Sequence, residues 1–81
     1  MAGHTNNVGD VTLDANQATT AVTDQRVNVN SAVILVPTSA NALADVVGTG
    51  VYVSSIGDDT FTITHPNNAN ADKTFKYVIV G

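Results

Sequence analysis

His65 is the residue of this chain with the most versatile chemistry, because an imidazole can act as a general base or bind a metal near neutral pH. It follows the alternating segment 60–64 and precedes Pro66. A metal site needs several ligands, yet the only other histidine is His4, far away in the sequence, and cysteine is absent. We therefore expect His65 to be a structural histidine, hydrogen-bonded where a strand leaves its sheet, with no bound metal or cofactor.

A second candidate is the polar stretch that contains Asn68, Asn70 and Asp72, whose spacing matches the first three ligands of an EF-hand calcium loop. Such a loop also needs glycine at its sixth position and a bidentate glutamate at its twelfth. Lys73 stands at the sixth position and the chain contains no glutamate. The pattern favours a polar loop in which asparagine side chains bond their own backbone.

The adjacent carboxylates Asp58 and Asp59 are a third candidate, as a pair for acid–base catalysis. Neighbouring residues of a strand or turn tend to point apart, and nothing in the sequence places a partner that would raise a pKa beside them. None of the serines lies in a Gly-x-Ser-x-Gly context, and there is no glycine-rich phosphate loop. We expect no catalytic residue and no enzymatic activity.

The composition excludes several classes of partner. The net charge is -4 with only 3 lysines and arginines, so no basic patch is available for nucleic acid or for an anionic membrane surface. The longest apolar run, residues 32–36, is too short to span a bilayer. The first residues lack the pattern of a secretory signal, which predicts synthesis in the cytoplasm.

The length of 81 residues predicts one domain with a thin core. Domains of this size usually gain stability from disulfides, a metal or a partner. Because the chain has 0 cysteines, self-association is the simplest expectation.

The elements that must position these residues are mostly strands, because threonine and valine are abundant and strong helix formers are scarce. We expect a small all-β sandwich or barrel of about seven short strands, with one or two helical turns at residues 41–47 capped by Ser39 or Thr38 and stopped by Gly48. The alternative for residues 41–47 is a loop, because so short a helix needs tertiary support. Leu43, Val46 and Val47 have helical spacing. The expected strands are residues 11–14, 19–23, 26–29, 32–36, 51–55, 60–65 and 73–81. The last two are expected to form a central hairpin.

Alternation along these strands predicts which side chains face inward. The expected core consists of Val33, Leu35, Val53, Phe61, Ile63, Phe75, Tyr77 and Ile79. Residues 32–36 are apolar on both faces, which suggests a central strand covered on two sides, so Ile34 and Val36 are candidate contact residues, together with Tyr52. Arg26, Lys73 and Lys76 are expected to be exposed charges on strand edges, or else partners for an aspartate of a neighbouring subunit.

Residues 1–8 are expected to form a tail or arm and residues 9–81 the domain. Within that domain, a set of short segments carries a resemblance to a known family. The segments are Asn30-Ser31, Pro37-Thr38, Ala40-Asn41-Ala42, Tyr52-Val53-Ser54, Phe61-Thr62-Ile63-Thr64-His65, Asp72, Thr74-Phe75 and residues 77–81. In their order and spacing they resemble a small β-sandwich module of tailed-bacteriophage virion proteins, which occurs alone or at the C-terminal end of tail-fibre-like chains.

The resemblance implies a structural part of the virion and brings no catalytic residues. On this basis we expect an accessory capsid decoration or cement protein that forms a homo-oligomer, such as a trimer, and binds other virion proteins such as the major capsid protein. The alternative is a tail or tail-fibre component that contacts a host receptor, with Tyr52 in the contact surface.

Overall fold

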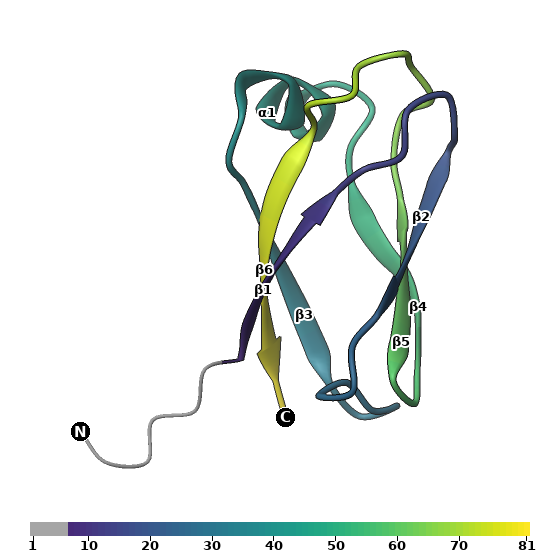
Figure 1. The fold of residues 1–81 in the computed structure, drawn as a ribbon, viewed down its shortest axis with the longest axis vertical. Helices are drawn as coiled ribbons and strands as arrows, with labels where there is room; N and C mark the ends of the chain where they lie inside the picture. The colour runs from purple at the N-terminus through teal and green to yellow at the C-terminus, as the bar shows by residue number, and fades with distance from the viewer. Residues whose placement is uncertain (1–6) are drawn as a thin grey trace, which may run out of the picture.

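The structure is a computed structural model that describes residues 7–81. The strands are β1 (Val8–Thr12), β2 (Thr19–Thr23), β3 (Ala32–Pro37), β4 (Tyr52–Gly57), β5 (Thr60–Thr64) and β6 (Thr74–Val80), and the helix is α1 (Ala40–Val47). Two antiparallel three-stranded sheets, in the orders β1-β6-β3 and β2-β5-β4, face each other (Figure 1). The predicted all-β sandwich with one short helix is confirmed. It is open rather than a closed barrel, and these residues form six strands instead of seven.

The strands β5 and β6 are the middle strands of their sheets, but the predicted hairpin between them is wrong. β5 pairs with β2 and β4, whereas β6 pairs with β1 and β3. The segment 65–73 instead crosses from one sheet to the other. The two strands therefore direct their large apolar side chains into the core from opposite sheets. We call the segment 65–73 the crossover.

The predicted strand at residues 26–29 is a turn instead. The carboxylate Oδ1 of Asp24 accepts a hydrogen bond from the backbone N–H of Arg26 at 3.0 Å, and the carbonyl of Asp24 accepts one from Val27. These bonds fold the chain back on itself, so Val27 is buried while Val29 is 62% exposed rather than inward. Of the predicted N-terminal arm, residues 1–6 lie outside the described part, and Val8 is already the first residue of β1.

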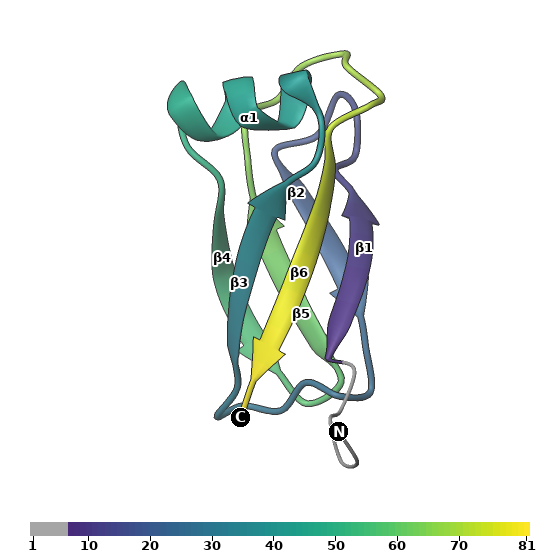
Figure 2. The same cartoon turned by 90° about the vertical axis from the view of Figure 1, so that its left-hand side faces the viewer.

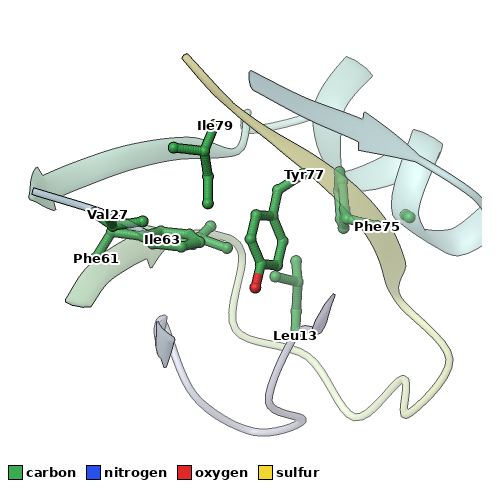
Figure 3. Packing of buried hydrophobic residues seen from close by; sticks show 8 residues of the cluster. Leu13, Val27, Phe61, Ile63, Phe75, Tyr77 and Ile79 are labelled. Atoms are coloured by element: carbon green, nitrogen blue, oxygen red, sulfur yellow. The ribbon is translucent and has the colours of Figure 1, made fainter. Parts of the chain in front are cut away.

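The core lies between the sheets and depends on large side chains from β5 and β6 (Figure 3). The rings of Phe61 and Tyr77 meet edge to face, with centroids 5.1 Å apart and planes at 70°. Five expected core residues are buried, namely Phe61, Ile63, Phe75, Tyr77 and Ile79. The other three pack against this cluster and are partly buried, namely Val33, Leu35 and Val53. Leu13, Val27 and Ala42 complete the core.

Strand β3 lies at the edge of its sheet, so the expectation of a central strand is wrong. Its outward side chains Ile34 and Val36 are 53% and 45% exposed. They remain uncovered within the described chain because the second sheet packs only on the inward side.

The helix α1 forms as predicted and lies across one end of the sandwich (Figure 2). The hydroxyl of Ser39 accepts a hydrogen bond from the N–H of Ala42, and Gly48 ends the helix. The helix does not bury its apolar side chains, because Leu43, Val46 and Val47 are exposed. It buries Ala42 and the acidic residue Asp45, which directs attention to the polar groups below it.

Truncation of either core phenylalanine tests this arrangement. Phe61→Ala or Phe75→Ala is expected to lower the free energy of unfolding by about 3–5 kcal/mol, since each leaves a cavity in a fully buried site. Urea unfolding followed by circular dichroism measures the loss. Val29→Ala, in the exposed turn, serves as the control and should change stability by about 0.5 kcal/mol or less. A loss below about 1 kcal/mol at Phe61 would contradict its central position.

Candidate functional site

A buried polar cluster lies beneath helix α1, and its central residue is Lys73. This lysine was expected to be an exposed edge charge, but its side chain is 0% exposed. The reason is its position at the end of the crossover, directly before β6, where its amine lies 3.4 Å from Asp45 of α1. We use the name helix-end cluster for Asp45, His65, Pro66, Asn68 and Lys73.

The carboxylate of Asp45 lies between two partners in this cluster. The Nζ of Lys73 is 3.4 Å from Asp45 Oδ2 and donates a hydrogen bond to the carbonyl oxygen of Pro66 at 3.3 Å. The Nδ2 of Asn68 donates to Asp45 Oδ1 at 3.2 Å. Among the described residues, Oδ2 of Asp45 is a buried oxygen without a hydrogen bond. Removing both charges of such a pair from water carries a desolvation cost that the pair itself must offset.

His65 lies at the end of β5 and is buried. Its Nδ1 is 2.9 Å from the carbonyl oxygen of Pro66, which can only accept a hydrogen bond, so the ring proton is on Nδ1. Its Nε2 then accepts from the hydroxyl of Thr20 at 2.7 Å, and that hydroxyl accepts from the N–H of Asp14. Both ring nitrogens are therefore engaged inside the fold, the structural arrangement expected of this histidine.

The other candidate residues are not brought together. The side chain of Asn68 turns toward Asp45, whereas the carboxylate of Asp72 accepts from Nδ2 of Asn41 at 2.8 Å. Asp58 and Asp59 are exposed in the β4–β5 turn. Within residues 7–81, no group of three or more histidine, aspartate or glutamate side chains is placed to hold a metal ion, and no pocket is present.

A second polar cluster joins the two sheets, and sequence reasoning missed it. Asp24 follows β2 and receives hydrogen bonds from Arg26, with Nε 3.0 Å from Oδ1 and Nη2 2.7 Å from Oδ2. The hydroxyl of Tyr77, from the opposite sheet, donates to Oδ2 at 2.7 Å. The hydrogen bonds from Arg26 hold the pKa of the Asp24 carboxyl well below its usual range. Burial, and then the bond to Asp24, raises the pKa of Tyr77.

The ring of Tyr77 reaches Asp24 by passing over Gly9, its register partner on β1. A Cβ at Gly9 would overlap the tyrosine ring, with Cζ and Oη its nearest atoms. A larger residue at this position would displace the ring and its hydrogen bond. The sequence signal was present, since a glycine inside a strand often marks such a close approach.

The sheet β1-β6-β3 faces the viewer in Figure 2, and its outward side is largely apolar. Val8, Val78 and Ile34 align in register across the three strands, and Ala32 aligns with Val80. Val8, Ile34 and Val80 are 41%, 53% and 52% exposed. The next row holds Asp10, Lys76 and Val36, with Lys76 Nζ 2.8 Å from Asp10 Oδ1. We call these eight residues the apolar face.

The outward side of sheet β2-β5-β4 differs in chemistry. Thr19, Thr64 and Tyr52 align across it, as do Ala21, Thr62 and Ser55. Thr23 and Thr60 complete the pattern. Tyr52 is 59% exposed. This surface, which we call the hydroxyl face, offers hydroxyl groups and one aromatic ring without a charged side chain.

No family, curated protein or solved structure matches this chain. In residues 7–81 the single helix is α1, and it is far too short to cross a membrane.

The Asp24 cluster predicts how stability depends on pH. A carboxyl whose pKa is depressed by folding stabilises the protein above the unfolded pKa, about 3.9, and this stabilisation is lost as the pH falls below that value. Asp24→Asn should therefore be less stable than the wild type at pH 7, and the difference should narrow as the pH falls below about 4. Urea unfolding at a series of pH values from 7 to below 4 measures this difference in the free energy of unfolding.

Asp58→Asn, in an exposed turn, provides the matched control for that titration, and its curve should run parallel to that of the wild type. A constant gap between Asp24→Asn and the wild type at all pH values would show that the Asp24 charge does not stabilise the fold.

Proposed function

We propose that this chain is a non-enzymatic structural protein of a bacteriophage virion, an accessory capsid decoration or cement protein that self-associates on the particle surface. Its location would be the virion, after synthesis in the host cytoplasm. The family resemblance of residues 9–81 supports the virion assignment. The observation that supports this mode of action is the apolar face, where the side chains of Ile34, Val36 and Val80 are 53%, 45% and 52% exposed.

A second copy of the chain suits this face for two reasons. Its only charged pair, Asp10 and Lys76, is already neutralised internally at 2.8 Å, so two copies can meet without like-charge repulsion. The strand β3 also lies at the edge of its sheet, so its backbone can pair with a strand of a second copy beside the exposed Ile34 and Val36. Repeated weak contacts across many copies, and with a lattice of other virion proteins such as the major capsid protein, would supply affinity through avidity.

Mutation of the apolar face tests self-association. Ile34→Asp places a charge among the exposed apolar side chains of the face and should weaken association by roughly tenfold or more, because the charge would be buried in the interface. Sedimentation velocity over a concentration series measures the effect. Val29→Asp, an equally exposed site in a turn, is the control and should associate like the wild type. A wild type that remains monomeric at high concentration would refute the proposal.

The alternative is a tail or tail-fibre component that contacts the host, and the hydroxyl face favours it. Tyr52 stands 59% exposed in register with Thr64 and, through it, with Thr19. An aromatic ring flanked by hydroxyls can stack on a sugar ring while the hydroxyls bond its polar groups.

Antibody labelling of intact phage particles, viewed by electron microscopy, separates the two functions. Label over the head is expected for a decoration protein. Label confined to the tail would favour the host-contact function, for which Tyr52→Ala should abolish binding to host cells while leaving the circular dichroism spectrum unchanged. Val29→Ala, an exposed residue outside the hydroxyl face, is the control for that binding experiment.

A further inference from the structure

The buried amine of Lys73 lies beside a carboxyl group from another element, so a nucleophile and an acyl group are held in contact. Its side chain is 0% exposed and that of Asp45 is 7% exposed, and Nζ lies 3.4 Å from Asp45 Oδ2. The carboxyl carbon Cγ is one covalent bond beyond that oxygen. Residues 45 and 73 come from α1 and from the end of the crossover, so the fold alone brings them together.

We propose that this pair condenses to an amide, an intramolecular isopeptide bond between Lys73 Nζ and Asp45 Cγ. The bond forms once per molecule, without turnover, and would tie the helix to the start of β6. The inference rests on the helix-end cluster alone and is independent of the function proposed above.

The reaction needs no oxidant, reductant or other reactant. One proton passes from the ammonium of Lys73 to the carboxylate of Asp45, which leaves an amine and a carboxylic acid. The nitrogen lone pair attacks Cγ, the N–C bond forms, and the carbonyl electrons move onto Oδ1. The carbonyl then re-forms as the Cγ–Oδ2 bond breaks. Oδ2 leaves as water, with the proton of the acid and one proton from the attacking nitrogen.

The surrounding groups suit each step. Asn68 Nδ2 already donates to Oδ1 at 3.2 Å, the oxygen on which negative charge develops. Oδ2, the oxygen that leaves, has no hydrogen bond among the described residues. The Pro66 carbonyl accepts from Nζ at 3.3 Å, so it can orient the amine and afterwards accept the N–H of the amide.

Proximity of the two groups speeds the reaction, and burial favours its neutral product. Holding two reactants in contact gives effective concentrations of about 10⁵–10⁸ M in favourable geometries. The product is neutral, so the fold no longer pays the desolvation cost of two buried charges. The structure contains its own contrast in the pair Lys76 and Asp10, which is closer at 2.8 Å but is 55% and 76% exposed. We expect no amide there because water surrounds both groups.

Intact-mass spectrometry of the purified, denatured full chain is the primary test. The expected mass is lower than that calculated from the sequence by one water molecule. The full calculated mass would show a plain buried ion pair and overturn the proposal. A loss equal to one ammonia molecule would also overturn it, since the acyl group would then come from an asparagine.

Trypsin digestion of the denatured protein locates the bond. The cleavage sites are Arg26, Lys73 and Lys76. An acylated Lys73 resists trypsin, so the expected product is the fragment 27–76 minus one water, with normal cleavage after Lys76. Fragmentation of that product must place the link at Asp45. Cleavage after Lys73 would refute the bond. This readout uses only the wild type and does not depend on a variant folding.

Two variants exclude other dehydrations, such as a succinimide. Lys73→Met and Asp45→Ala should each show the full mass of their own sequences, whereas the matched control Lys76→Met should keep the loss of one water. Persistence of that loss in Lys73→Met would assign it to another site and overturn the proposal.

Discussion

The contact between Phe61 and Tyr77 across the core is the interaction on which the rest of this structure depends. Each ring comes from the middle strand of its sheet, and the two rings meet edge to face at 5.1 Å. A chain of 81 residues without cysteine has few other means of joining two three-stranded sheets. The same tyrosine extends to Asp24, which directly follows β2 of the opposite sheet, and Gly9 leaves the room that its ring requires. Tyr77 thus packs in the core, bonds Asp24 and lies opposite Gly9 in the pairing of β6 with β1.

The sequence predicted the class, most strands and the helix, because these follow from local alternation, capping and turn residues. It also identified the large core side chains of β5 and β6. It failed at the pairing of these two strands, since alternation shows which side of a strand is apolar and not which strand lies beside it. The turn at residues 26–29 was missed because the apolar alternation of Val27 and Val29 outweighed the turn chemistry of Asp24.

Prediction of the candidate site was poorer, for a physical reason. Lys73 was placed on the surface because lysine is almost never fully buried without a partner. Its partner Asp45 lies in α1, and neither periodicity nor spacing connects the two positions. The signal available was the helix itself, in which Asp45 stands among apolar residues. A helix usually buries its apolar side chains and exposes its charges, whereas α1 does the opposite. Polar contacts of Asp45 therefore help to hold this helix against the sandwich.

The ends of the described chain leave the sandwich at the same end, opposite the helix (Figure 1). Val8 begins β1 and pairs with Val78 near the end of β6, which continues to Gly81. A force that pulls these two ends apart would act across the β1–β6 ladder and open its hydrogen bonds one after another, as in a zipper. Such a domain yields to tension at low force when loaded through its ends. It would resist a larger force applied to the outward sides of the two sheets, because the many contacts of the core would have to break together.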